Sequence, residues 1–209
     1  MTSLFTRYKA SLQNFALQRF SITGWWLLAA LAYAIARLLQ FWLDGSYAAS
    51  RFPVPFFVGQ TTFDAIELKG YFAVLVQQGT LGIFARTQII DYAFMAGTFV
   101  SFYCLASALM RTVKRVFSGR VMRSIALVFV WLSPLAAVMD ALENAVSFVM
   151  LANPLGFYDW LVYPYSSFAV IKFALFALTY CWAIVALASC LLAGFASLFF
   201  RSTEQGVAK

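Results

Sequence analysis

Polar residues interrupt a long apolar segment at residues 139–148, MDALENAVSF. Asp140 and Glu143 are three positions apart and Asn144 follows directly, so all three lie on one side of a helix. Two neighbouring carboxyl groups can act as a general acid and a general base when their surroundings differ. A charged group at membrane depth costs about 3 kcal/mol unless it is paired or faces water. We therefore expect these residues to form either a neutralised structural network or a functional site.

The composition is typical of multi-pass membrane proteins. Of the 209 residues, 63% are hydrophobic and only 11% are charged, whereas about a quarter of the residues in a soluble domain are charged. The chain contains no histidine, which excludes histidine-ligated haem and zinc and catalytic triads that use histidine. The three cysteines form no CxxC motif. We predict one integral membrane domain over residues 1–209, with no metal site and no cofactor.

Four segments are apolar over the roughly 20 residues that a helix needs to cross a bilayer. They cover about residues 22–43, 89–110, 124–151 and 167–200. This pattern predicts an all-α fold, a bundle of four transmembrane helices. Pro134 lies within the third segment and removes one backbone donor there, which predicts a kink.

The connection between the first two spans is expected to contain a further helix. Residues 61–78 place apolar side chains at helical spacing, which predicts an amphipathic helix on the outer side of the membrane. Thr61 and Asp64 resemble a capping box at its start, and Gly79 is a suitable end. The preceding stretch FPVPFFV, residues 52–58, is apolar and is expected to lie against the membrane interface or the bundle.

Lysine and arginine residues are distributed unequally between the two sides. One side carries ten of them: Arg7, Lys9, Arg19, Arg111, Lys114, Arg115, Arg120, Arg123, Arg201 and Lys209. The other two connections carry only Arg51, Lys69 and Arg86. By the positive-inside rule, both termini and the 111–123 connection face the cytoplasm of a bacterial cell, with the protein in the inner membrane. The basic connection is expected to contact anionic membrane lipids, not nucleic acid.

Five charged residues from the four spans fall at a similar depth near the outer side: Arg37, Asp91, Asp140, Glu143 and Lys172. Each shares a helical stripe with other polar or small residues, and such stripes turn away from lipid. In the first span the stripe consists of Tyr33, Arg37, Gln40 and Asp44. We predict that the five charged residues and Asn144 converge in one polar cluster. One carboxyl group is then left over and needs a proton, water or a cationic partner.

Two stretches, FDAIELKGYFAVLVQQGTLGIFARTQIIDYAFM and LSPLAAVMDALENAVSFVML, resemble a family of small, uncharacterised bacterial four-helix integral membrane proteins. A D-x-x-E-N signature in the third span marks that family. The resemblance covers roughly residues 60–180 and rests on Gly82, Arg86, Asp91, Pro134, Asp140, Glu143 and Asn144. It implies a four-span fold and no particular activity.

Three functions remain open. The sequence favours a structural or accessory membrane subunit, whose ion network fixes helix packing and which works with a protein partner or as a homo-oligomer. The second is a protein that binds a lipid-like or isoprenoid-like small molecule, or an enzyme that uses Asp140 or Glu143 as acid or base. The third is a proton- or cation-coupled transporter. A pocket beneath the outer helix would favour binding, whereas the apolar cytoplasmic halves of the spans disfavour a path across the membrane.

Overall fold

The computed structural model describes the backbone of residues 20–207 and the side chains of residues 20–196. The described chain is entirely helix and connecting loop, which confirms the predicted all-α class. The elements in chain order are α2 (Ile22–Ser50), α3 (Phe56–Gln60), α4 (Ala65–Gln77), α5 (Leu81–Val116), α6 (Arg120–Leu132), α7 (Leu135–Leu151), the 3-10 helix η1 (Asp159–Leu161) and α8 (Val162–Val207).

Four helices are long and apolar enough to cross a membrane. These candidate spans are Ile22–Ser50, Leu81–Val116, Arg120–Leu151 and Asp159–Ala196. The second and fourth begin before the predicted starts at 89 and 167 because their first turns contain polar residues that lower the local hydropathy. The chain is therefore a multi-pass membrane protein.

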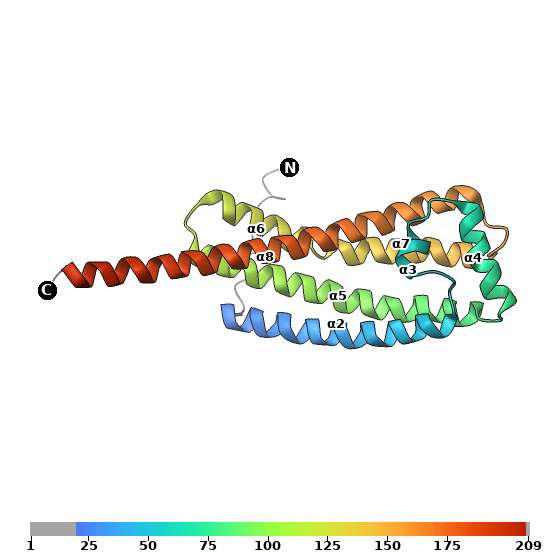
Figure 1. Ribbon diagram of the computed structural model, residues 1–209, viewed down its shortest axis with the longest axis horizontal. Helices are drawn as coiled ribbons and strands as arrows, with labels where there is room; N and C mark the ends of the chain where they lie inside the picture. Colours follow the sequence, from blue (N-terminus) through green and yellow to red (C-terminus); the bar gives the residue numbers. More distant parts are fainter. Residues whose placement is uncertain (1–19, 208–209) are drawn as a thin grey trace, which may run out of the picture.

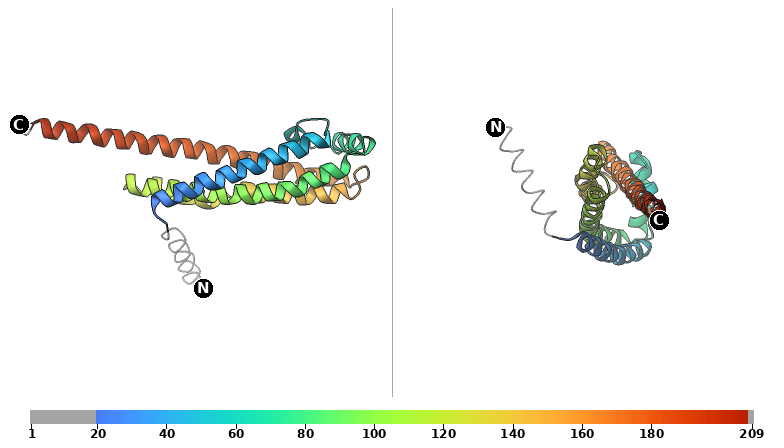
Figure 2. Two further views of the ribbon diagram at one scale, coloured as in Figure 1. Left: turned by 90° about the horizontal axis from the view of Figure 1, so that it is seen from below. Right: turned by 90° about the vertical axis from the view of Figure 1, so that its left-hand side faces the viewer.

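The long helices run side by side (Figures 1 and 2), and α5 has the most α-helix neighbours. Helix α5 contacts α2, α6, α7 and α8, whereas α2 packs chiefly along α5 and α8 chiefly along α7. Helix α4 lies across one end, which we call the α4 end (Figure 1). The α5–α6 connection lies at the opposite end, which we call the loop end, and α8 continues beyond it.

Pro134 interrupts the third span, as predicted. Helix α6 ends at Leu132 and α7 begins at Leu135. Proline has no backbone N–H to donate to the preceding turn, so the helical ladder is broken there. Two shorter-range bonds replace it, from Ala136 N to Ser133 O at 3.3 Å and from Ala137 N to Pro134 O at 3.2 Å. The third span is thus two helices joined at a fixed bend.

The predicted helix over residues 61–78 is shorter than expected, and its start was wrongly assigned. Thr61 ends α3, and its hydroxyl donates to the carbonyl of Phe57 at 2.7 Å. Phe63 has a φ of 50°, which no α-helix permits. Asp64 is the actual N-cap: its carboxylate accepts from the backbone N–H groups of Ile66 at 2.8 Å and Glu67 at 3.2 Å.

Gly79 ends α4, as predicted, in a left-handed conformation with a φ of 70°. The N–H of Thr80 donates to Leu75 O at 2.9 Å, and the N–H of Gly79 donates to Val76 O at 3.1 Å. This pair of bonds is the Schellman motif, which satisfies the last carbonyls of a helix. The motif turns the chain directly into α5.

Polar contacts also fix the exposed side of α4. The Glu67 carboxylate accepts hydrogen bonds from Thr62 and Tyr71, and these bonds hold the pKa of Glu67 below its usual range. Lys69 forms an ion pair with Asp159 of η1 at 2.5 Å. Because Asp159 is 74% exposed, that pair positions the helix more than it stabilises it.

Two apolar clusters fill the two ends of the bundle. At the α4 end, Leu68, Phe72 and Leu75 of α4 are fully buried against residues of α5, α7 and α8. At the loop end, the buried cluster joins all four spans and includes Trp25 and Trp182. The buried charged residues of α5, α7 and α8 lie between these two clusters.

The end of α4 provides a test of the fold. Gly79→Ala places a Cβ at a φ of 70° and should lower the free energy of unfolding by about 1–2 kcal/mol. Gly70, inside α4, has open space where a Cβ would lie, so Gly70→Ala should be neutral or stabilise by up to about 1 kcal/mol. Thermal unfolding in detergent and hydrogen exchange of the α4 amides measure both. Equal effects of the two alanines would contradict the assigned helix end.

Candidate functional site

Four charged side chains from three helices meet in the interior of the bundle. Lys172 of α8 places its Nζ 2.7 Å from Asp140 Oδ1 and 2.5 Å from Glu143 Oε2, both on α7. Asp91 of α5 completes the set, and each of the four residues is at most 7% exposed. We call Asp91, Asp140, Glu143 and Lys172 the buried charge cluster.

Amide side chains attach Asp91 to the rest of this cluster. The Asn144 side-chain amide donates to Asp91 Oδ2 at 2.9 Å and to the backbone carbonyl of Gln88 at 3.4 Å. The Gln88 amide in turn donates to the hydroxyl of Ser147 at 3.3 Å. These bonds link α5 to α7, as the Lys172 ion pairs link α7 to α8.

The helical stripe of the third span is buried as predicted. Its members are Ser133, Ala136, Ala137, Asp140, Glu143, Asn144 and Ser147. The alanines on the stripe let neighbouring helices approach closely, and the polar members then face one another across the interfaces. On α5 and α8, Asp91 and Lys172 are buried as predicted, and the hydroxyl residues Thr98, Ser101 and Thr179 are buried on the same helices.

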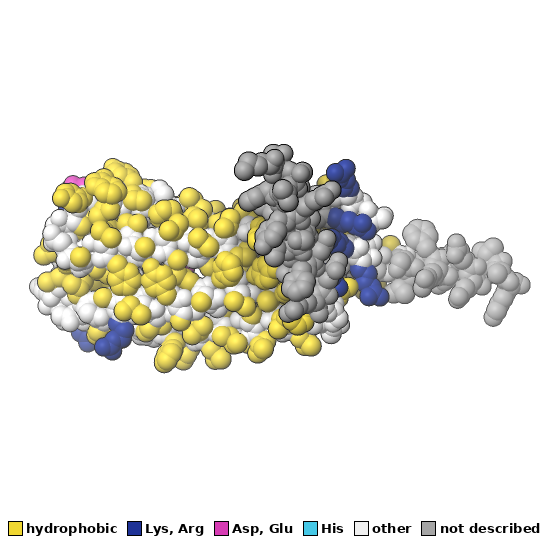
Figure 3. Space-filling view, turned by 180° about the vertical axis from the view of Figure 1, so that it is seen from behind, with side chains coloured by type: hydrophobic (Ala, Val, Ile, Leu, Met, Phe, Trp, Pro, Cys, Tyr) yellow, Lys and Arg dark blue, Asp and Glu magenta, His cyan; other side chains and the backbone are white. Residues whose placement is uncertain are grey.

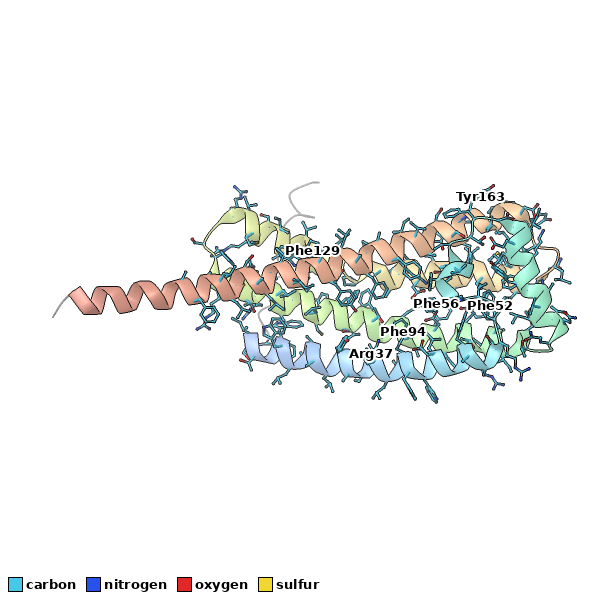
Figure 4. The ribbon with its side chains drawn as sticks, viewed as in Figure 1. Arg37, Phe52, Phe56, Phe94, Phe129 and Tyr163 are labelled. Atoms are coloured by element: carbon cyan, nitrogen blue, oxygen red, sulfur yellow. The ribbon has the colours of Figure 1, made fainter. Side chains whose placement is uncertain are left out.

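The prediction that Arg37 joins the cluster was wrong. Arg37 is exposed near the middle of α2, and within the described residues it forms no ion pair (Figure 4). Helix α2 instead buries its small residues Ala29, Ala32 and Ala36 against α5. At this seam a Cβ on Gly97 would lie 3.5 Å from the Cα of Ala36. Close packing of small residues therefore set the rotation of α2, which leaves Tyr33 and Arg37 of its polar stripe exposed.

Because Arg37 lies outside the buried charge cluster, the net charge of the cluster differs from the predicted one. Among the described residues, the buried charged side chains are three carboxyl groups and one ammonium group. The formal surplus is thus two negative charges, one more than the sequence predicted. Such a surplus needs protons, water or a cationic group close by.

A cavity of about 280 Å³ adjoins the cluster toward the α4 end. Aromatic side chains form much of its wall; Figure 4 labels Phe52, Phe56 and Phe94. The lining residues are Gln40, Leu43, Asp44, Tyr47, Phe52, Phe56, Gln60, Phe84, Thr87, Gln88, Asp91, Phe94, Asp140, Tyr165, Lys172, Phe173 and Phe176. We call this space the aromatic cavity.

Members of the cluster differ in their access to the aromatic cavity. Asp91, Asp140 and Lys172 line it, whereas Glu143 and Asn144 do not. Glu143 is fully buried and contacts Lys172 without lining the cavity. Glu143 therefore positions the lysine, while Asp91 and Asp140 can touch a bound molecule.

The segment before α4 covers the cavity. Phe52, Phe56 and Gln60 line it, so the cover is α3 and its preceding loop and not the helix predicted at 61–78. Gln60 is 8% exposed, and its Oε1 has no hydrogen-bond partner among the described residues. The apolar stretch FPVPFFV was the sequence signal for this cover, but the sequence did not connect it with the polar cluster.

The cavity opens at the side of the bundle, between α2 and α8. Leu43 of α2 and Phe173 and Phe176 of α8 are half-buried at this opening, and Asp44 is exposed. Helix α2 has little direct contact with α8, so the two helices form separate edges of the opening.

No three acidic or cysteine side chains of the described region are arranged to hold a metal ion. The chemistry available at the site is ionic and hydrogen-bonding recognition and proton transfer by carboxyl groups. A bound molecule would meet carboxylates, aromatic faces and amide groups.

Lys172 should be the residue on which the cluster depends most. Lys172→Met leaves Asp140 and Glu143 without their partner and should lower the free energy of unfolding by about 3–5 kcal/mol. The triple variant Lys172→Met, Asp140→Asn, Glu143→Gln removes the stranded charges and should recover most of the loss. Arg37→Ala, on exposed α2 surface, should change stability by no more than about 0.5 kcal/mol. Melting temperatures in one detergent measure all three, and a costly Arg37→Ala would contradict the assigned network.

Comparisons with known proteins give no family for the chain. No protein-family model matches it, and no curated protein or solved structure does so either. The four candidate spans agree with the architecture that the resemblance to small four-helix membrane proteins implies. What is shown is a multi-pass membrane protein with buried charged residues.

Proposed function

We propose that the protein binds a lipid-like small molecule, which enters the aromatic cavity from the membrane between α2 and α8. The observation that carries this proposal is the cavity itself, with aromatic walls and with three members of the buried charge cluster on its surface. Ligand sites typically combine an apolar concave surface with a few polar groups that fix orientation.

A purely structural role for the cluster agrees less well with this geometry. An ion network that serves only packing is best enclosed by side chains, because an unfilled volume in a core reduces stability. Here Asp91, Asp140 and Lys172 border open space, and Gln60 has an unsatisfied oxygen. Glu143 and Asn144 supply the structural part of the network, behind the cavity.

Transport across the membrane is the weaker alternative. Between the cluster and the loop end, the interior is filled by the packed apolar cluster that includes Leu109, Met110 and Trp182. The buried hydroxyl groups of Ser107, Ser133 and Thr179 also lie there, but the described residues place no buried charged side chain in that part of the interior. If the bound molecule undergoes acid or base chemistry, the geometry assigns it to Asp140 and Asp91, because Glu143 does not reach the cavity.

We further propose that the α4 end faces away from the cytoplasm, in the inner membrane of a bacterium. Lysine and arginine side chains gather at the loop end, with fewer at the α4 end (Figure 3). Arg7, Lys9, Arg19 and Lys209 lie outside the described residues, and the side chain of Arg201 is also not described. In this orientation the cavity opens toward the outer leaflet.

Reporter fusions test the orientation directly. A fusion after residue 55, at the α4 end, should report the outer side, and a fusion after residue 117, at the loop end, should report the cytoplasm. Alkaline phosphatase and a fluorescent protein give complementary signals for the two sides. The same side for both fusions would refute the four-span topology, and exchanged sides would refute the orientation.

A variant that fills the cavity tests binding. Leu43 is half-buried at the opening, so Leu43→Trp should occupy the cavity and remove co-purified lipid-like molecules without lowering the melting temperature. Leu38, on the same helix, is 70% exposed and lies outside the cavity lining, so Leu38→Trp is the matched control. Native mass spectrometry of the detergent-solubilised proteins measures the bound molecules. Equal ligand content in wild type and both variants would contradict the proposal.

A further inference from the structure

We infer that the molecule bound in the aromatic cavity carries a positively charged amine, and that this group lies between Asp91, Asp140 and the aromatic walls. The inference rests on the proposed binding function and specifies its ligand class, an amphiphile with an ammonium head. Charge, hydrogen-bonding groups and wall composition support it separately.

The charge balance favours a cation. Three buried carboxyl groups face one ammonium group, and that ammonium already has two carboxylate partners at 2.7 and 2.5 Å. Asp91 accepts a hydrogen bond from the neutral amide of Asn144, and none of the described ion pairs includes it. Asp44 adds a further carboxylate at the opening. A cationic head would supply the partner that Asp91 lacks.

Hydrogen-bond acceptors suited to a cationic head group border the cavity. A protonated primary amine is a donor of three hydrogen bonds and accepts none. Asp91 and Asp140 provide carboxylate oxygens, and the buried Oε1 of Gln60 has no partner among the described residues. An unsatisfied buried oxygen at this place fits a donor from a ligand.

Aromatic rings around the acidic groups fit the same head group. Cations are attracted to the faces of aromatic rings within about 6 Å, and quaternary ammonium ligands are recognised in this way. Rings from four parts of the chain line the cavity: Tyr47, Phe52, Phe56, Phe84, Phe94, Tyr165, Phe173 and Phe176. The walls therefore suit both the charge of an ammonium group and the carbon atoms beside it.

An anionic head group fits poorly. Among the described residues that line the cavity, Lys172 is the only basic one, and Asp140 and Glu143 already neutralise it. Arg37 lies one helical turn from Gln40 on α2, but it is exposed and outside the lining. A carboxylate or phosphate inside the cavity would meet Asp91 and Asp140 without a free cation.

The volume limits how much of the ligand lies inside. Sites for complete small molecules occupy about 300–1,000 Å³, and this cavity of about 280 Å³ is at the lower limit. It holds the head group and the first carbons of a chain. The rest of the chain passes between α2 and α8 into the membrane.

Four probes with the same chain separate the head groups: decylammonium, decyltrimethylammonium, decanol and decanoate. Each is titrated by calorimetry, below its micelle concentration, into the full-length protein in a non-ionic detergent at pH 7, where an alkylamine is protonated. We expect at least one of the two cations to bind at least about tenfold tighter than decanol and decanoate, equivalent to about 1.4 kcal/mol.

Charge-neutralising variants assign the effect to the cavity. Asp91→Asn and Asp140→Asn should each weaken binding of the cations about tenfold or more and leave that of decanol nearly unchanged. Asp159→Asn removes the same charge from an exposed residue outside the cavity lining and should leave all affinities unchanged. Melting temperatures of the three variants without ligand show whether each is folded.

The outcomes distinguish this inference from the proposed function. Equal affinity for the cations and decanol, or tightest binding of decanoate, would overturn the ammonium inference and leave lipid-like binding intact. Equal loss of cation binding in Asp159→Asn would also overturn it. Binding of none of the four probes, together with no co-purified molecule in the wild type, would overturn both.

Discussion

The structure depends on compensating the positive charge of Lys172, which is buried inside the bundle. An unpaired lysine inside a membrane bundle is expensive, and two carboxylates from the adjacent helix offset that cost only when their geometry is close. The contacts at 2.7 and 2.5 Å meet this requirement. They fix how α8 is rotated and shifted against α7. Through Asn144 the same constraint extends to Asp91 and hence to α5.

The packing of the other helices follows from the side chains that each of them places around the buried charge cluster. Apolar clusters lie on both sides of the ion pairs, and α4 closes one end because its three fully buried apolar residues need a partner surface. Pro134 allows α7 to take the direction that the cluster requires, while α6 packs separately near the loop end. Helix α2 contributes no charged group to the cluster, and its small residues bring it close to α5.

The positions of the spans and the buried face of α7 could be predicted from the sequence, because both depend on residues that are close together in the chain. Span positions follow from hydropathy, and the buried stripe of α7 follows from the spacing of Asp140, Glu143 and Asn144. The rotation of α2 could not be predicted, because a polar stripe and a small-residue stripe compete and only the partner helix decides between them. The segment that covers the cavity could not be predicted either. The predicted helix over residues 61–78 is interrupted at Phe63, and this interruption depends on a single unusual backbone angle. Periodic sequence patterns predict which face of a helix is buried, whereas a cavity is formed by residues that are distant in the sequence.

The little direct contact between α2 and α8 has a consequence for the site in its natural setting. In the proposed mode of binding the two edges of the opening are separate, and hydrocarbon chains of the bilayer are the material that adjoins them. Lipid thus forms the remaining wall of the site. Its order and packing become part of the binding equilibrium, because an incoming molecule displaces acyl chains and not water. Affinities measured in detergent, in thin bilayers and in ordered bilayers should accordingly differ even though the protein surface is the same.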